Sequence, residues 1–341
     1  MNVFVRHYER KPRAGNFSIE RAFEAVRKRL PEDIQAIAHH SPFQSRGIVR
    51  RIINIMDAMA HQGAVNHIVG DVHYLALGLR KQRTILTIHD CVGLRFRRGM
   101  RRFVLLWFWY RLPIRRAAAV VAISRFTREE ILQLSGCESG KVHVIPEAVT
   151  PDFHPCPKEF NAEKPVILQI GTSEHNKNLV RVAEALRGIP CQLHIIGRLT
   201  GTQCEVLKKN RIEYAEEWNL SDEQMVERYC QCDLVIFAST YEGFGMPIVE
   251  ANATGRPVVT SNLCSMPEVA DKAACLVDPL DSWSIRAGVL RIINEPQYRN
   301  QLIANGFENT KRFSADLIAR KYAALYREVF SRSEHKSRVG S

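Results

Sequence analysis

A continuous apolar run that leads through a glycine-containing loop into a second apolar run constrains this chain more than any other feature. Residues 233–238, Asp-Leu-Val-Ile-Phe-Ala, predict a buried strand, because a parallel strand covered on both faces is hydrophobic along its whole length. Pro247 follows at a position suited to the first turn of a helix, where the missing N–H costs nothing. A strand joined directly to a helix is the building unit of a doubly wound α/β domain.

The loop between this strand and helix combines backbone freedom with two carboxylates. Gly243 and Gly245 allow a tight turn that directs N–H groups at a ligand, and a helix N-terminus approached this closely favours phosphate. Glu242 lies just before the loop, and Glu250 lies within the helix that follows. Carboxylates repel phosphate, but each can accept two hydrogen bonds from neighbouring sugar hydroxyls. These residue types together indicate a site for a sugar nucleotide.

The segment 239–278 closely resembles the donor-binding region of the retaining family-four (group 1) glycosyltransferases, including their E-x7-E pair, here Glu242 and Glu250. The resemblance implies the GT-B fold, an α/β architecture of two Rossmann-like doubly wound domains that face a central cleft. It also implies a retaining, metal-independent glycosyltransferase that moves a hexose, mannose-like or other, from a nucleotide-diphosphate sugar to a glycan or lipid-linked acceptor. The later parts of this segment match the family as well, in the runs 251–259, 266–270 and 277–279.

The resemblance assigns roles to individual residues of this segment. Glu250 would hold the ribose hydroxyls, and Glu242 those of the transferred sugar. Because backbone amides and a lysine would stabilise the leaving diphosphate in place of a metal ion, we expect no metal and no cofactor, and a UDP- or GDP-sugar as donor. The amides expected to bind the diphosphate belong to Gly243, Phe244, Gly245 and Met246.

A second loop repeats the arrangement of apolar strand, glycine turn and helix. It contains Gly171 and Thr172, followed by Lys177, which is placed to reach a diphosphate as a point charge. The family usually has Arg-Lys-Asn here, whereas this chain has Asn176, Lys177 and Asn178. An asparagine cannot replace a planar cation, so one contact to the leaving group is missing. Either another basic residue compensates, or the enzyme is slow or inactive.

His89 and Asp90 end an apolar strand in the first half of the chain, at the sheet edge where open α/β domains bind ligands. Taken alone, a His-Asp pair is more often structural. The family has a histidine at this position that faces the transferred sugar, so the resemblance implies that His89 completes the sugar pocket after the domains close. Asp90 either fixes the tautomer of His89 or caps the following turn. The expected catalytic residues are therefore His89, Glu242 and Lys177.

The chain divides into five segments. Residues 1–150 form the acceptor-side Rossmann-like domain, the proline-rich residues 151–164 form a linker, and residues 165–314 form the nucleotide-sugar domain. The family resemblance implies that the amphipathic helix 315–330 packs back on the first domain. The polar residues 331–341 are expected to form a disordered tail.

Short apolar runs predict the individual strands, and Ser124 is expected to cap the start of a helix. The clearest strands are residues 3–5, 67–69, 84–88, 119–123 and 142–145 in the first half, and 166–170, 193–196, 233–238 and 258–259 in the second.

Basic charge is concentrated in the first half, because residues 1–150 have a net charge of +13 and residues 151–341 of −1. This field favours an anionic partner such as lipid phosphate, an acidic membrane surface or an acidic glycan, although a merely solvated basic surface is an open alternative. Residues 101–116 place four consecutive aromatics between arginine pairs, either in a membrane interface or in a core helix. We expect a cytoplasmic protein, in contact with the inner face of the membrane at most, and no nucleic-acid partner.

Other patterns argue against metal and redox chemistry. The nine cysteines are scattered, so reduced thiols are expected. The spacing of His61, His67 and His73 suits neither a helix face nor a strand face, so these three residues predict no metal site. The sequence contains neither an Asp-x-Asp motif nor the Gly-x-Gly-x-x-Gly pattern of NAD-binding proteins.

Two alternatives to transfer stay open. The chain can be a degenerate GT-B protein that binds a nucleotide sugar or an anionic partner without transfer, which Asn176 supports. It can also be a sugar-nucleotide epimerase or a phosphorylase, since the fold serves these enzymes too.

Overall fold

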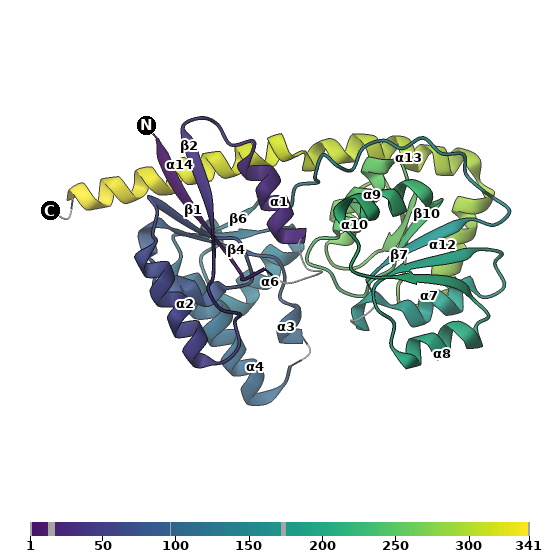
Figure 1. Ribbon diagram of the computed structural model, residues 1–341, viewed down its shortest axis with the longest axis horizontal. Helices are drawn as coiled ribbons and strands as arrows, with labels where there is room; N and C mark the ends of the chain where they lie inside the picture. The colour runs from purple at the N-terminus through teal and green to yellow at the C-terminus, as the bar shows by residue number, and fades with distance from the viewer. Residues whose placement is uncertain (1, 13–17, 96, 172–174, 340–341) are drawn as a thin grey trace. The chain divides into compact units, whose positions relative to one another are not determined.

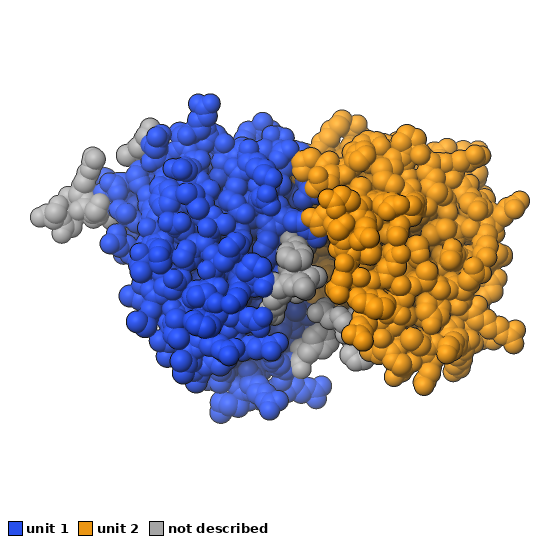
Figure 2. Space-filling model, in the orientation of Figure 1, with its two compact units in different colours: residues 1–150, 314–341 blue, residues 151–313 orange. Residues whose placement is uncertain are grey.

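The computed structural model describes residues 2–12, 18–95, 97–171 and 175–339 of the chain. These residues form two compact units, which Figure 2 shows in blue and orange. Unit 1 contains residues 1–150 and 314–341, and unit 2 contains residues 151–313. The chain therefore passes between the units twice. Within unit 1, Val149 and Ser314 lie beside these two crossings and pair in a parallel β-bridge.

Unit 1 is built on a parallel sheet of six strands in the order β2-β1-β3-β4-β5-β6 (Figure 1). Its order reverses between β1 and β3, whose residues Val5 and Val65 are paired. Ligands of open α/β sheets bind outside the carboxyl ends of the strands at such a reversal. The strands are β1 (Val3–Glu9), β2 (Ile34–His40), β3 (Val65–Ile68), β4 (Thr84–Ile88), β5 (Ala119–Ala122) and β6 (Val142–Val144).

Helices cover both faces of this sheet, which explains why its inner strands β3, β4 and β5 are buried at every position. One face carries α1 (Ser18–Arg27) and α14 (Ala315–Val339). The other face and its connections carry α2 (Ile48–Ala60), η1 (His73–Leu77), η2 (Lys81–Arg83), α3 (Val92–Arg95), α4 (Gly99–Leu105), η3 (Leu106–Arg111), α5 (Leu112–Arg116), α6 (Arg125–Ser135) and η4 (Ser139–Lys141).

The last helix differs from the sequence prediction at its C-terminal end. The prediction of a disordered tail from residue 331 is wrong for the described residues, because α14 continues to Val339. An ion pair at 2.9 Å between Arg83 and Glu334 holds this part of the helix to unit 1. Ser333 is buried as well, so the polar composition of the segment concealed a packed face.

Unit 2 has a parallel sheet in the order β12-β11-β10-β7-β8-β9, which in chain order is the 3-2-1-4-5-6 arrangement of dinucleotide-binding domains. The strands are β7 (Val166–Ile170), β8 (Gln192–Ile196), β9 (Glu213–Glu217), β10 (Leu234–Phe237), β11 (Val258–Ser261) and β12 (Cys275–Val277). The order reverses between β7 and β10, so the loops that follow these two strands border the expected binding crevice.

In the described part of unit 2, helical segments connect the strands or follow the last strand, and 22 of the described residues form one apolar core cluster. The segments are η5 (His175–Lys177), α7 (Leu179–Leu186), α8 (Gly201–Lys209), α9 (Asp222–Gln231), α10 (Met246–Thr254), α11 (Met266–Ala270), α12 (Ser282–Asn294), α13 (Pro296–Thr310) and η6 (Lys311–Phe313).

A hydrogen-bonded chain of buried side chains ties α14 to the sheet of unit 1. The Tyr326 hydroxyl lies 2.9 Å from His7 Nε2 and 2.8 Å from His67 Nδ1, and His67 Nε2 lies 2.7 Å from Thr87 Oγ1. Burial lowers the pKa of His7 well below its usual value and that of His67 to about 3. Both imidazoles are therefore neutral, and each needs the Tyr326 hydroxyl as a hydrogen-bond partner.

We predict that Tyr326→Phe lowers the free energy of unfolding by about 1–3 kcal/mol, because two buried imidazole nitrogens lose their partner while the packing volume is retained. Denaturant unfolding of both proteins measures the difference. A loss below about 0.5 kcal/mol, the range of an ordinary surface substitution, would show that the hydroxyl does not anchor α14.

Candidate functional site

The predicted donor residues of unit 2 lie in the two loops that follow β7 and β10, at the reversal of the strand order. These loops are tied to each other directly. The Thr240 amide donates to Asn176 O at 2.8 Å, and Asn176 Nδ2 donates to Tyr241 O at 2.8 Å. The topology therefore brings the two sequence motifs together at one crevice edge.

An ion pair joins the two loops at their polar side chains. Lys177 Nζ lies 2.7 Å from Glu242 Oε1, and the two side chains are 21% and 15% exposed. The stem of Lys177 crosses Gly171, whose φ is +84°, and a Cβ on this glycine would lie 3.0–3.3 Å from three carbons of the lysine. Lys177 Nζ also lies 5.3 Å from the centroid of the Phe237 ring. Gly171 is therefore needed both for the turn and for the path of the lysine.

The loop from Glu242 to α10 is shaped by a serine that the sequence prediction missed. The fully buried Ser265 hydroxyl lies 2.9 Å from Glu242 O and 2.7 Å from Phe244 O. Gly245 has a φ of +117°, which a side chain would strain, and α10 begins directly after it at Met246. Among the described residues no side chain caps this helix. Pro247 has no N–H and the Ile248 amide donates to Gly245 O at 3.0 Å, so the amides of Met246 and of the loop before it are the ones expected to bind the diphosphate.

The two asparagines beside Lys177 are structural. Asn176 is only 3% exposed and its amide group points inward to Tyr241. Asn178 has a φ of +60° and donates through Nδ2 to Ala238 O at 2.9 Å and Pro279 O at 2.6 Å. Asn176 therefore does not present a substitute for the charge of the family's usual arginine.

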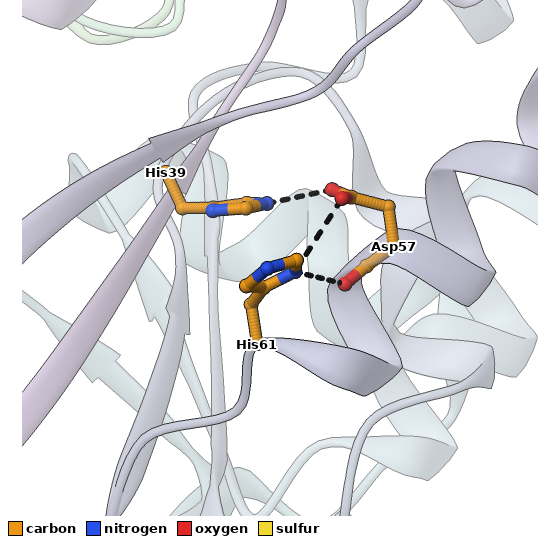
Figure 3. A group of neighbouring side chains, drawn as sticks. All are labelled: His39, Asp57 and His61. Carbon is orange, nitrogen blue, oxygen red and sulfur yellow. Dashed lines mark hydrogen bonds and ion pairs between the residues drawn. The ribbon is translucent and has the colours of Figure 1, made fainter.

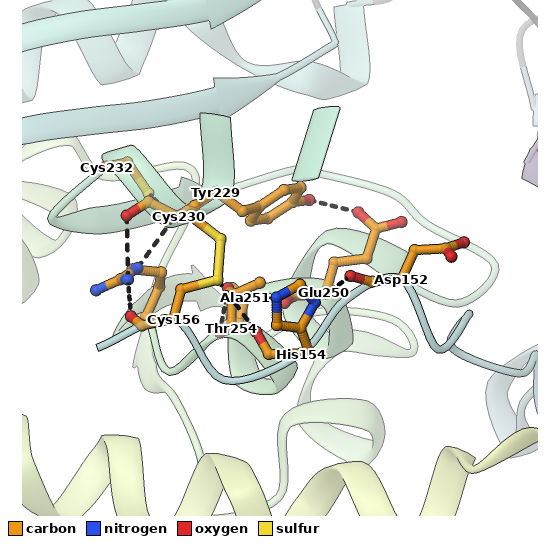
Figure 4. The surroundings of a disulfide bond; sticks show 10 residues. Asp152, His154, Cys156, Tyr229, Cys230, Cys232, Glu250, Ala251 and Thr254 are labelled. Atoms are coloured by element: carbon orange, nitrogen blue, oxygen red, sulfur yellow. Dashed lines mark hydrogen bonds between the residues drawn. A yellow bond between two sulfur atoms is a disulfide. The ribbon is translucent and has the colours of Figure 1, made fainter. Parts of the chain in front are cut away.

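Glu250 is held by a tyrosine on the neighbouring helix (Figure 4). The Tyr229 hydroxyl of α9 donates to Glu250 Oε2 at 2.5 Å. Burial raises the pKa of Tyr229 well above its usual value, and the charge of Glu250 adds to the effect. Tyr229 thus stays a neutral donor that fixes one carboxylate oxygen of Glu250.

A disulfide lies beside this tyrosine, which corrects the expectation that all cysteines are reduced. Cys156 and Cys230 are bonded across 74 residues of sequence (Figure 4). The pair forms because the linker folds back along unit 2, where the Cys156 amide donates to Thr254 O at 3.3 Å. Arg256 donates to the carbonyls of both cysteines and to Tyr229 O. The sequence could not predict this pairing from two isolated cysteines.

His89 belongs to unit 1 and carries its own hydrogen-bonded environment. Its Nδ1 lies 2.8 Å from Glu147 Oε1, and its Nε2 lies 2.8 Å from Val69 O. Burial lowers the pKa of His89, but the hydrogen bond and charge of Glu147 outweigh burial and raise it above the usual value. Since both ring nitrogens face acceptors, His89 favours the imidazolium form.

Asp90 takes the second of its two predicted roles. Its Oδ1 accepts a hydrogen bond from the Val92 amide at 2.9 Å and so caps the turn before α3. The partner of His89 is instead Glu147, which lies 58 residues further along the chain, and no local pattern indicates it.

The structure thus brings most of the predicted donor residues of unit 2 together. Thr172 lies outside the described residues. His89 lies in the other unit. The residues gathered at the loops after β7 and β10 are Gly171, Asn176, Lys177, Glu242, Gly243, Phe244, Gly245 and Met246, with Glu250 further along α10.

Two family models match the chain. "Glycosyl transferases group 1" matches residues 152–309, and "Glycosyltransferase Family 4" matches residues 64–153. Among curated proteins, the chain is similar to O-antigen chain mannosyltransferase B of Escherichia coli, with 29% identity over 58% of this chain and 57% of that protein. A serotype-specific mannosyltransferase of the same organism is 26% identical, but the match covers only 27% of its length. The chain thus spans about half, or less, of the length of these relatives.

Solved structures agree in fold at low sequence identity. Sucrose-phosphate synthase of Thermosynechococcus elongatus matches 97% of this chain and 100% of its own with a TM-score of 0.77 at 16% identity. HepE of Anabaena, solved with UDP and glucose, matches 95% of this chain and 99% of its own with a TM-score of 0.74 at 16% identity. The strand order, the donor motifs and both family matches lead to one assignment: the chain belongs to the group 1 glycosyltransferases and has the GT-B fold.

Proposed function

We propose that this protein transfers a hexose from a UDP- or GDP-linked sugar to a glycan or lipid-linked acceptor, with retention of anomeric configuration and without a metal ion. The observation that carries the proposal is the Lys177–Glu242 ion pair, held between two crossing loops beside the first amides of α10. The relatives named mannosyltransferases of O-antigen chains favour mannose as the sugar and a polysaccharide as the acceptor.

The ion pair suggests how the donor is accommodated. The pair is largely buried, with side chains 21% and 15% exposed, so each charge must regain a partner when the donor separates them. Lys177 would turn to the diphosphate, whose second contact is the amides at the start of α10. Glu242 would be released to accept hydrogen bonds from the sugar hydroxyls. Donor binding therefore breaks one ion pair and forms another, between Lys177 and the diphosphate, while Glu242 gains hydrogen bonds from neutral hydroxyls.

Glu250 would hold the ribose through hydroxyl hydrogen bonds. Tyr229 fixes its Oε2, so the carboxylate meets the diol in one orientation without a change of rotamer. Tyr229 acts as a positioning residue, because its own contact is with Glu250 and not with the ligand.

The proposed chemistry needs no separate base. In a retaining transfer on the same face of the sugar, the departing phosphate oxygen accepts the proton of the acceptor hydroxyl as the new glycosidic bond forms. Lys177 and the α10 amides would stabilise the charge that develops on the diphosphate as the old bond breaks. The inward-facing Asn176 leaves this charge with one cation fewer, which favours a slow enzyme or the binding-only alternative.

His89 is proposed to contact the transferred sugar as an imidazolium. Both of its N–H groups are already used, by Glu147 and by Val69 O. A sugar hydroxyl must therefore replace one of these acceptors, and the backbone carbonyl of Val69 is the weaker of the two because it is uncharged.

Contact with an anionic membrane is the part of the proposal that unit 1 supports. On α2, the exposed side chains include Ile48 at 75%, Val49 at 70% and Met56 at 63%. The segment 101–116 has both buried and exposed aromatic side chains, since Tyr110 is buried while Phe103 and Phe108 are more than half exposed. Arginines are exposed beside these side chains, at residues 46, 50, 95, 97, 98, 101 and 102.

Apolar and basic side chains on one protein surface are typical of a helix that lies in the headgroup region. Leu105, Leu106 and Trp109 of the second segment pack against the same core cluster as Ala58 of α2, so both segments cover the same face of the sheet. No helix within the described residues is long and apolar enough to cross a bilayer.

We predict that a donor-type nucleotide sugar, UDP- or GDP-linked, raises the melting temperature, and that Lys177→Met and Glu242→Gln each weaken its binding by about tenfold or more, the value of one charged hydrogen bond. Titration calorimetry with GDP-mannose and UDP-glucose measures this effect. Lys209→Met, at an exposed position of α8, serves as the control and should bind like the unmodified protein. No response to any nucleotide sugar would overturn the donor site, while binding without transfer to membrane-extract acceptors would favour the binding-only alternative.

We predict a pH dependence from His89. A histidine whose pKa is raised in the folded state stabilises the fold fully below its unfolded pKa of about 6.5, and this stability is lost as the pH rises through the folded pKa. Glu147→Gln should lower the pKa of His89 in an NMR titration, and should lower the melting temperature more at pH 6 than at pH 9. Glu138→Gln, on the exposed surface, is the control. An unchanged His89 pKa in Glu147→Gln would contradict the assignment.

We predict that the double variant Ile52→Ser, Met56→Ser reduces binding to vesicles of anionic lipid by about tenfold or more. The variant removes several exposed CH2 groups that the bilayer would bury, each worth about 0.8 kcal/mol. Vesicle sedimentation measures the effect, with zwitterionic vesicles for comparison. The control Val180→Ser, an exposed residue of unit 2, should bind normally. Equal binding of all proteins to both vesicle types would refute a membrane surface on α2.

A further inference from the structure

Two histidines and an aspartate of unit 1 meet where the edge strand β2 lies beside the end of α2 (Figure 3). His39 is on β2, Asp57 is in the last turn of α2, and His61 is the residue directly after that helix. Asp57 and His61 are four residues apart, a spacing that places both on one helix face. These residues have no part in the donor site, whose loops belong to unit 2.

The three side chains converge on one carboxylate. His39 Nε2 lies 2.6 Å from Asp57 Oδ2, and His61 Nδ1 lies 3.4 Å from Asp57 Oδ1. The two imidazole rings are stacked, with centroids 4.7 Å apart and an interplanar angle of 28°. The three ligand atoms all lie within 4.8 Å of one another. Two imidazole nitrogens and one carboxylate oxygen are a ligand set that suits zinc.

The buried Tyr8 side chain supports the cluster of His39, Asp57 and His61. Its buried hydroxyl donates toward Ala58 O at 3.1 Å and His61 O at 3.0 Å, which fixes the end of α2. Its ring packs edge-on against His39 at 5.6 Å. Arg6 Nε donates to His61 O at 3.1 Å as well. The backbone that carries all three groups is therefore positioned by the core, and only their side chains need to adjust.

We propose that His39, Asp57 and His61 bind a zinc ion, which clips the edge strand β2 to α2 and leaves a fourth position for water. Ligand atoms of tetrahedral zinc lie about 2.0–2.2 Å from the metal and hence roughly 3.3 Å apart, a value between the two contacts that Asp57 makes. His61 supplies the remaining movement, since its side chain is 50% exposed. Its Nδ1–H hydrogen bond to Asp57 O at 2.8 Å is given up when Nδ1 binds the metal and the proton resides on Nε2.

Solvent reaches the site, as the exchange of a metal ion requires. The His39 side chain is 18% exposed and that of Asp57 is 25% exposed, so an ion can enter from solvent while the inner edge of the site stays packed. No histidine spacing in the sequence reveals the site, because its first ligand is on a strand, the second is in the last turn of the following helix and the third is the residue after that helix. Of the regularly spaced His61, His67 and His73, His61 alone belongs to this cluster.

Titration of the EDTA-treated full-length protein with zinc, followed by calorimetry and by the melting temperature, tests the proposal. We expect one equivalent to bind and the melting temperature to rise with zinc concentration. Asp57→Asn and His39→Gln should each weaken zinc binding by more than about tenfold, since even outer-shell changes cost that much. His154→Gln, an exposed histidine of unit 2, is the control and should bind zinc like the unmodified protein.

Cobalt distinguishes this site from any zinc taken up by the free cysteines, because thiolates are a different class of ligand. Cobalt in a His2Asp site gives visible d–d absorption without a thiolate charge-transfer band in the near ultraviolet, and Asp57→Asn should abolish the d–d bands. The d–d bands can be measured without any transferase activity, so they test the site separately from the proposed function. A thiolate band, equal zinc binding by all variants, or no binding at all would each overturn the proposal.

Discussion

The donor site depends on how two loops are fastened to each other where the strand order of unit 2 reverses. The fastening is made by buried polar groups. Asn176 and Asn178 donate across to the carbonyls of the β10 loop and of the segment after β12, and Ser265 holds the loop that carries Glu242. Because a buried polar group without its partner costs about 1–3 kcal/mol, these contacts favour one loop conformation over its alternatives. The charges of Lys177 and Glu242, whose side chains are 21% and 15% exposed, then meet without having to order the backbone themselves.

The elements that could be predicted from the sequence are those with a local cause. The strand before Glu242 is apolar at every position because helices cover both of its faces, and Ser124 caps α6 through its own neighbour, the Thr127 amide at 3.0 Å. The edge strand β9 escaped prediction, since its residues Glu213–Glu217 are mostly polar and none of them is buried. An edge strand faces solvent and needs no apolar pattern.

The parts of the site that could not be predicted come from distant contacts. Glu147 meets His89, Tyr229 meets Glu250, and Cys156 meets Cys230 only after the sheet order has been established. The polar end of α14 appeared disordered for the same reason, because its anchor Arg83 is 251 residues away in the sequence. Local patterns report propensity and periodicity, whereas these pairings are decided by topology.

Histidine illustrates how the surroundings determine the chemistry of one residue type within unit 1. His7 and His67 are neutral structural links under α14, because burial without a neighbouring carboxylate disfavours their charge. His89 is slightly more exposed, at 12%, and favours the cation, because Glu147 accepts a hydrogen bond from its ring. Composition alone cannot distinguish the neutral histidines from the protonated one. The atom that faces each ring nitrogen does distinguish them.

The two passages of the chain between its units determine how the units are covalently connected. Residues 150 and 151 form one crossing, residues 313 and 314 the other, and the Val149–Ser314 bridge ties the two strands together on the unit 1 side. Unit 2 is therefore inserted between two segments of unit 1, and both of its ends attach to unit 1 at neighbouring points. A protease cut at one crossing would leave unit 2 covalently joined to one segment of unit 1, either residues 314–341 or residues 1–150, while the other segment would be held by packing alone.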